Sequence, residues 1–225
     1  MPTFQTDFTP PAAPTGIAAY ANVTASSVDL SWTATSLGGD FLHYHVYRST
    51  DGGLTFSLLA TISSEALAAH SDYLAPLDVP LIYHVTVTNV DELESDPAVV
   101  SSELDIDQWW IVRPGDVSLT FHVRHVDAER DVTPRPTEQY VAMGRSRKVV
   151  VSGQQLGHEG SLSAVVTPSD RGLIDLLRAA AALPDEYVLL KTPFGEVFRV
   201  RLADVSRSRG QAGHQTVELP FIEVA

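Results

Sequence analysis

The sequence predicts a mainly β protein in which two β-rich parts follow one another and one helix lies in the second part. Short segments alternate between apolar and polar residues, and a single stretch has helical periodicity. The charge balance also changes near residue 107. Residues 1–107 hold 14 of the 28 acidic residues and one of the 15 basic residues, so they carry −13 and the rest is neutral. Since one domain takes roughly 150 residues, this division of a 225-residue chain predicts two domains.

The composition of the chain excludes several kinds of site and partner. The chain has no cysteine, so a disulfide framework, a thiolate metal site and a catalytic cysteine are excluded. An acidic surface is repelled by phosphate backbones and anionic lipids, so we expect neither nucleic-acid binding by the N-terminal domain nor a membrane partner. The N-terminal residues lack the basic and apolar regions of a signal peptide, and we expect synthesis without one.

The first part begins with a proline-rich arm and continues as a series of strands. Residues 1–15 contain four prolines, which favours an extended arm. From Gly16 onward the predicted strands are "IAAY", "SVDLSW", "FLHYHVYR", "FSLLATI" and "LIYHVTVTN", separated by turn sequences such as "TDGG" and "DELESD". Val28, Leu30 and Trp32 alternate on one face of the second strand. Short strands at such spacing are typical of a β-sandwich.

These residues resemble a fibronectin type III domain. The match covers about residues 10–103, and the domain itself is predicted at 16–103. The similarity rests on "PAAPTGIAAY", "SSVDLSW", "YHVYRSTDGGLTF" and "PLIYHVTVTN". Trp32 takes the place of the tryptophan that this family buries, and Tyr83 that of its tyrosine corner. The chain has no RGD tripeptide, so the resemblance implies a spacer or interaction module and no particular ligand.

Residues 104–108 form the predicted acidic hinge, and two adjacent tryptophans follow it. Neighbouring side chains of a strand point to opposite faces, so Trp109 and Trp110 are not expected to enter one core. One alternative is that one tryptophan enters the core of the second domain and the other packs at the domain junction. The other alternative is a contact between subunits.

The second domain, residues 109–225, is predicted to combine strands with one helix. "VSLTFHVRHV" alternates as a half-buried strand, residues 127–139 and 203–214 are polar loops, and "YVAMGRSRKVVVSG", "EGSLSAVVT" and "QTVELPFIEV" add strands. Thr167 and Pro168 suit a helix start, and Leu173, Leu176, Leu177 and Ala180 form an apolar stripe up to Ala182. A hairpin is predicted over 187–202, and Pro220 predicts an edge or a bulge in the last strand.

This order of elements resembles the tail-tube-type β-barrel of long-tailed phages, especially distal and minor tail proteins of actinobacterial phages. The similarity rests on "GRSRKVVVSG", on "GSLSAVVT", and on the helix with its "TPFGE" hairpin. It implies a virion tail protein made in the host cytoplasm that forms an oligomeric ring and contacts neighbouring tail proteins. The candidate interface residues are Trp109, Trp110, Arg145, Arg147 and Lys148, with Arg199 and Arg201 on a second basic strand, because basic side chains on strand edges can pair with carboxylates of a neighbour.

Several groups of side chains are candidates for a metal site or a catalytic site. His43 and His45 share one strand face, and His84 is expected on the neighbouring strand, so three imidazoles could bind zinc or respond to pH. The sequence places no carboxylate beside them as a second ligand shell. The alternative to a binding site is that these histidines lie on an exposed sheet face and have no function. The acidic run from Asp91 lacks the spacing of a calcium loop. The chain has no hydrolase, zinc-protease or nucleotide-binding motif, and we expect neither an enzyme nor a cofactor.

The sequence therefore predicts a structural minor tail protein that assembles through its barrel and displays an acidic fibronectin-like module. Host cell-surface glycans are the expected external partner of that module. The alternative is a glycan-binding accessory protein with a fibronectin-like spacer. It would need exposed aromatic side chains in the second half, for which Trp109, Trp110 and Phe194 are the candidates.

Overall fold

A computed structural model describes residues 9–123, 126–132, 137–140, 149–152, 159–167, 172–182, 187–203, 205–209 and 215–224. The chain divides into two compact units. The first contains residues 1–107 and Thr192–Val197, and the second contains Gln108–Lys191 and Phe198–Ala225. The turn of the predicted hairpin therefore groups with the first unit, although both of its strands belong to the sheet of the second. Strands dominate both units, so the predicted mainly β fold class is confirmed.

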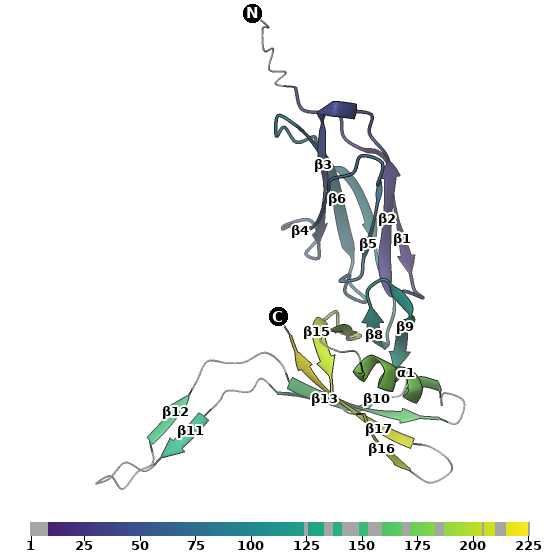
Figure 1. The fold of residues 1–225 in the computed structure, drawn as a ribbon, viewed down its shortest axis with the longest axis vertical. Helices are drawn as coiled ribbons and strands as arrows, with labels where there is room; N and C mark the ends of the chain where they lie inside the picture. Colours follow the sequence, from purple (N-terminus) through teal and green to yellow (C-terminus); the bar gives the residue numbers. More distant parts are fainter. Residues whose placement is uncertain are drawn as a thin grey trace, which may run out of the picture. The chain divides into compact units, whose positions relative to one another are not determined.

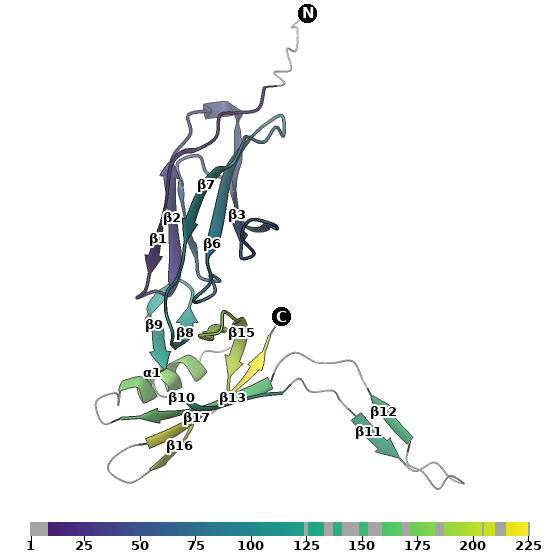
Figure 2. The same cartoon turned by 180° about the vertical axis from the view of Figure 1, so that it is seen from behind.

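The first unit is a sandwich of two antiparallel sheets (Figures 1 and 2). One sheet has the order β1-β2-β5, with β1 at Thr15–Asn22, β2 at Ser27–Thr33 and β5 at Ala69–Asp72. The other has the order β4-β3-β6-β7, with β4 at Ser57–Ile62, β3 at Phe41–Ser49, β6 at Leu81–Asn89 and β7 at Ala98–Ser102. A short 3-10 helix, η1 at Gly38–Asp40, precedes β3. This is the arrangement that the fibronectin type III resemblance implies.

Alternate residues of these strands fill the space between the two sheets. Val28, Leu30 and Trp32 are buried, as their spacing predicts, and Trp32 packs edge-on against Tyr44 with ring centroids 5.4 Å apart. Tyr83 and its alternating neighbours on β6 are also buried. The period-2 pattern therefore identified the core of this unit correctly.

An ion pair joins the two sheets inside the first unit. Arg48 on β3 donates a hydrogen bond from Nη1 to Oδ2 of Asp72 on β5 at 2.8 Å, and the Asp72 side chain is only 3% exposed. Tyr83 donates its hydroxyl to the same oxygen at 2.9 Å, while Leu74 N–H donates to Oδ1 at 3.0 Å. The predicted tyrosine-corner residue thus binds a carboxylate. Burial, together with this carboxylate, raises the pKa of Tyr83.

The segment predicted as a solvated hinge is partly buried. Leu104 and Ile106 are buried, and the Leu104 carbonyl accepts a hydrogen bond from Asp78 N–H at 2.8 Å. The acidic residues that alternate with them, Glu103, Asp105 and Asp107, are exposed. The alternation of leucine and isoleucine with acidic residues is a strand-like signal that the high charge of the segment concealed.

The second unit contains an eight-stranded antiparallel sheet with the path β10-β13-β17-β15-β14-β8-β9, and β16 also pairs with β17 (Figure 1). Its strands are β8 Trp109–Arg113, β9 Asp116–Val123, β10 Val126–Val132, β13 Glu159–Val166, β14 Val188–Lys191, β15 Val197–Leu202, β16 Ser206–Arg209 and β17 Gln215–Glu223. A separate hairpin joins β11, Thr137–Tyr140, to β12, Val149–Ser152. Within the described residues the path is open between β10 and β9.

Two polar segments that were predicted as loops are strands. Residues 126–132 form β10 and pair with β13, and residues 206–209 form β16 and pair with β17. Backbone pairing does not require apolar side chains, particularly at the end of a sheet, so these strands have no hydrophobic signature. Pro220 is also not on an edge. It lies in an inner strand, between the residues of β17 that pair with β16 and those that pair with β15.

The helix of the second unit packs on the sheet as predicted, with a small shift of its apolar stripe. α1 spans Gly172–Ala181, and residues 168–171, which contain the predicted start, lie outside the described residues. Ile174, Leu177 and Ala180 are its buried residues, whereas Leu173 and Leu176 are half-buried at the margin. They share one core with Val200 and Leu202 of β15. Arg199 and Arg201 alternate with these two residues and are exposed.

Both adjacent tryptophans are buried. Trp109 is 7% exposed and belongs to the core cluster that includes the helix. Trp110 is 6% exposed, lies outside that cluster, and contacts His122 with ring centroids 5.3 Å apart. This supports the first alternative for Trp109. Their participation in a subunit interface stays a prediction.

Candidate functional site

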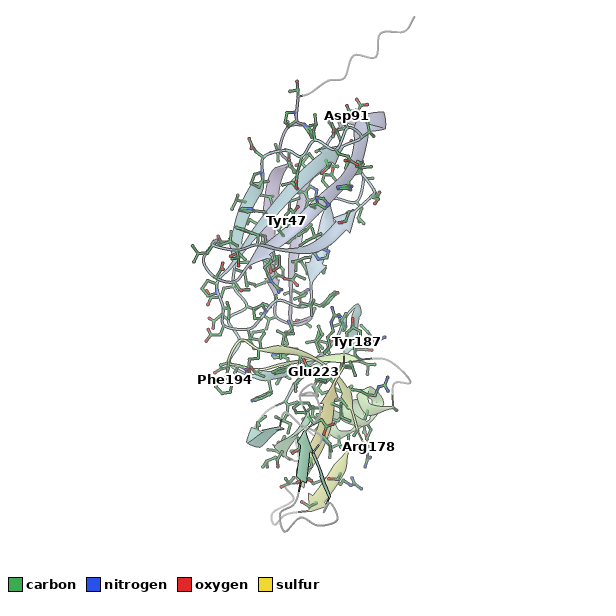
Figure 3. All side chains as sticks on the ribbon, turned by 90° about the vertical axis from the view of Figure 1, so that its left-hand side faces the viewer. Tyr47, Asp91, Arg178, Tyr187, Phe194 and Glu223 are labelled. Atoms are coloured by element: carbon green, nitrogen blue, oxygen red, sulfur yellow. The ribbon has the colours of Figure 1, made fainter. Side chains whose placement is uncertain are left out.

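The outer face of the sheet β4-β3-β6-β7 carries an unusual group of aromatic and imidazole side chains. His43, His45 and Tyr47 alternate outward along β3, and their partners in register on β6 are Thr88, Thr86 and His84. We call these six residues, together with Phe56 and Glu94, the histidine face. Figure 3 shows Tyr47 near the middle of this side of the first unit.

Glu94 is the hydrogen-bonding centre of the histidine face. Its Oε1 accepts hydrogen bonds from Thr86 Oγ1 at 2.5 Å and from the Tyr47 hydroxyl at 3.2 Å, and it lies 3.5 Å from His45 Nδ1. The turn after β6 brings Glu94 there, since Asn89 N–H donates to the Leu93 carbonyl and Glu94 forms a bridge with Thr88. The expectation that no carboxylate lies beside these histidines is therefore wrong.

The rings of the histidine face form two contacting groups. His43 and His45 have centroids 4.2 Å apart, and Tyr47 follows His45 at 5.7 Å. His84 stacks on Phe56 with centroids 3.9 Å apart and an interplanar angle of 21°. The predicted placement of the three histidines on one face is confirmed, but His84 contacts Phe56 and not the other imidazoles.

Two polar atoms on this face have no hydrogen-bond partner. They are Nε2 of His43 and Oγ1 of Thr88, which belong to residues paired in register across β3 and β6. A buried polar atom without a partner destabilises a fold by about 1–3 kcal/mol. Both atoms are themselves buried, so a ligand on the outer surface could reach them only after the covering side chains move.

On the histidine face the pKa shifts favour an ionised Glu94 and uncharged imidazoles at His43 and His84 at pH 7. Burial lowers the pKa of His43, and the neighbouring His45 lowers it further, while Glu94 and Glu92 act in the opposite direction. Burial also lowers the pKa of His84. Burial acts to raise the pKa of Glu94, but hydrogen bonds from Thr86, Tyr47 and His45 outweigh it and the net pKa is lowered. Glu94 therefore stays ionised while His43 and His84 are uncharged.

A metal site at the histidines finds no support. Among the described residues, no group of three or more His, Asp or Glu side chains is placed to hold a metal ion. His84 is stacked on Phe56, which leaves His43, His45 and Glu94 as an incomplete set.

No helix of the described chain is long and apolar enough to cross a membrane.

The remaining predicted interface residues are divided between two places. Arg145, Arg147 and Lys148 lie outside the described residues, so their interface role stays a prediction. Arg199 and Arg201 are exposed on β15, and the Arg199 guanidinium lies 5.5 Å from the centre of the Tyr187 ring.

Sequence reasoning did not select Tyr47, Phe56 or Glu94. For Tyr47 the signal existed, because it continues the alternation of His43 and His45.

No protein-family model matches the chain, and no curated protein matches it. A solved fibronectin type III-like protein from Clostridium thermocellum is similar at 26% identity over 41% of this chain and 92% of its own, with a TM-score of 0.35. A chain from the virion of a native gene transfer agent particle is similar at 11% identity over 53% of this chain and 92% of its own, also at 0.35. The titin kinase with its flanking domains is similar at 10% identity over 96% of this chain and 38% of its own, with a TM-score of 0.34.

The class of protein follows from the topology. The chain is a mainly β protein with a fibronectin type III-like sandwich followed by a second antiparallel β unit that packs one described helix.

One pH prediction arises from the first unit. Burial lowers the pKa of His70 on β5, against the raising effect of Asp72, and burial lowers those of His43 and His84. Folding therefore favours the neutral form of these imidazoles. Their contribution to the folding free energy is fully present above the unfolded pKa of about 6.5 and is lost as the pH falls below that value. We expect the urea midpoint of the first unit to be lower at pH 5.5 than at pH 7.5, and His70→Gln to reduce the difference. Equal midpoints at both pH values would contradict this assignment.

Proposed function

We propose that this protein is a structural protein of a long-tailed phage virion, of the minor or distal tail type. The second unit assembles into the tail or tail tip with copies of itself and with neighbouring tail proteins, and the first unit is displayed. The similarity of "GRSRKVVVSG", "GSLSAVVT" and the helix with its hairpin to tail-tube-type proteins supports this proposal. It implies location in the virion and no catalytic activity.

The observation that carries the proposal is the open, charged sheet of the second unit. Its path ends at β9 and β10 within the described residues, and β15 presents Arg199 and Arg201 outward. Open sheet edges invite uncontrolled pairing unless something covers them. In a closed ring, neighbouring subunits would provide that cover, and basic side chains would fix the register against carboxylates of the neighbour.

The charge of the first unit supports its role as a displayed module. Arg48 is its only Lys or Arg between residues 1 and 107, and it is used in the interior by Asp72. The surface contributed by residues 1–107 therefore carries many carboxylates and no Lys or Arg to pair with them. Copies of such a module repel each other, so assembly is expected to depend on the second unit.

The test is charge reversal on β15. Arg199→Glu with Arg201→Glu in the full chain should shift the mass distribution toward monomer or weaken binding to purified tail components by about tenfold or more. Exposed charge changes usually alter folding free energy by less than about 0.5 kcal/mol, so the subunit should stay folded. Arg178→Glu on the exposed side of α1 is the matched control, since Arg178 makes only a 3.9 Å contact with Asp175. Equal assembly by all three proteins would exclude β15 from the interface.

The glycan-binding accessory protein is less well supported as a whole. It needs exposed aromatic side chains in the second half, but Trp109 and Trp110 are buried. Among the large hydrophobic side chains described there, Phe194 and Tyr187 are the exposed aromatics. An aromatic group of the kind that binds sugars lies instead on the first unit.

A further inference from the structure

We propose that the histidine face is a binding site for an uncharged glycan. This inference rests on the proposed function, because a displayed module in a ring would present the site in several copies. Weak single-site binding would then gain strength through effective concentration. The experiment below observes the site through its own histidine signals, so that its result is separate from the measurement of assembly.

Charge argues for an uncharged ligand. Residues 1–107 contribute no Lys or Arg to the surface besides the internally paired Arg48, so an anionic polymer would meet only repulsion. A second copy of the unit is disfavoured for the same reason. On the histidine face itself Glu94 is the ionised group, while the outward residues of β3 and β6 are His, Tyr and Thr. This depletion of charge in an otherwise acidic unit is the composition expected at the centre of a binding surface.

The rings provide a stacking surface. Phe56 and His84 form one stacked pair, and Tyr47 with His45 continues the aromatic row on the neighbouring strand. Sugar rings present C–H groups on their faces, which pack on aromatic rings, and aromatic side chains bury a large area for few rotatable bonds. Imidazole and phenol rings also have polar edges that hydroxyl groups can reach.

Hydrogen-bonding groups border these rings. The contacts to Thr86, Tyr47 and His45 all engage Oε1 of Glu94, so Oε2 remains as an acceptor on a side chain that is 42% exposed. Sugar hydroxyls can donate to this carboxylate oxygen and can form hydrogen bonds with the polar edges of the half-exposed imidazole and phenol rings.

The experiment applies the full-length chain to an array of immobilised neutral and anionic glycans and then titrates each hit while observing the histidine side-chain NMR signals. We expect neutral glycans to bind and to shift the signals of His43, His45 and His84, and anionic glycans not to bind. Binding restricted to anionic glycans, or no binding to the array, overturns the proposal. Binding that leaves these signals unchanged places the site elsewhere and overturns it as well.

Variants locate the site within the unit. Tyr47→Ala should weaken neutral-glycan binding by about tenfold or more, and Glu94→Gln should weaken it by removing the charged acceptor. Tyr20→Ala is the matched control, because Tyr20 is 70% exposed on β1 of the other sheet. Thermal unfolding of each variant separates lost binding from lost fold. If both variants remain folded and bind like the wild type, the histidine face is not the site. A chain that assembles but binds no glycan would remove this inference and leave the proposed function intact.

Discussion

Trp32→Ala is expected to unfold the first unit while the second unit keeps its fold. Trp32 is 6% exposed and packs on Tyr44, which in turn packs on Phe41 with centroids 4.9 Å apart. Truncation of a buried tryptophan costs about 3–5 kcal/mol, a large part of the roughly 5–15 kcal/mol that stabilises a domain. Calorimetry of the full chain should then lose the transition of the first unit.

The matched control is Tyr20→Ala, in which an aromatic residue is removed from the surface of the same unit. Its effect should stay within about 0.5 kcal/mol, because Tyr20 is largely exposed. A thermogram of Trp32→Ala that resembles the wild type would show that the described core is incorrect. Loss of both transitions would show that the two units do not unfold independently.

Replacing one partner of the internal ion pair should have a similarly large effect. Asp72→Ala leaves Arg48, with a side chain only 16% exposed, without its carboxylate and removes the acceptor of the Tyr83 hydroxyl. Breaking a buried pair in this way costs about 3–5 kcal/mol, because the remaining charge is uncompensated. The urea midpoint of the first unit should fall accordingly.

The double variant Arg48→Met with Asp72→Leu tests the cause. Replacing both charges by apolar side chains removes the uncompensated charge, so a substantial part of the lost stability should return. The exposed Asp105→Ala serves as a control for a simple change of net charge. If the double variant is as unstable as Asp72→Ala with Arg48 retained, the unsatisfied charge is not the reason for the loss.

The sequence was most informative where one face of an element is buried and the other is solvated. β2 and β6 alternate as their residues predict, and the helix was found from its 3.6-residue period. The helix stripe was placed one residue off, since Ile174 and not Leu173 is the buried residue of the first turn. When the apolar stripe of a helix is wide, the helix can rotate slightly about its axis and still bury apolar residues, so the sequence pattern does not determine the exact rotation.

The second unit was harder to predict because its outer strands lack that contrast. β10 and β16 are held by backbone pairing with β13 and β17, which leaves no apolar period in their sequences. Pro220 shows the same limit. A proline usually marks an edge, but here the strand on one side of β17 is interrupted near it, with Ala203 N–H donating to the Pro220 carbonyl.

The candidate site was predicted only in part. Alternation placed His43 and His45 on one face and suggested His84 beside them. Glu94 could not be placed from sequence, since it reaches the face through a turn that looks like an ordinary acidic loop. Phe56 precedes β4, and the register between β3 and β4 shifts after Val46, so a strict period of two does not predict its stacking on His84.

The mass of the purified full-length protein tests whether the chain assembles through its second unit. Mass photometry combined with negative-stain imaging should show a closed ring of several copies, or a complex once purified tail components are added. The basic strand β15 and the segment with Arg147 and Lys148 should be needed for it. A protein that stays monomeric at high concentration and also fails to join tail components would contradict the structural role.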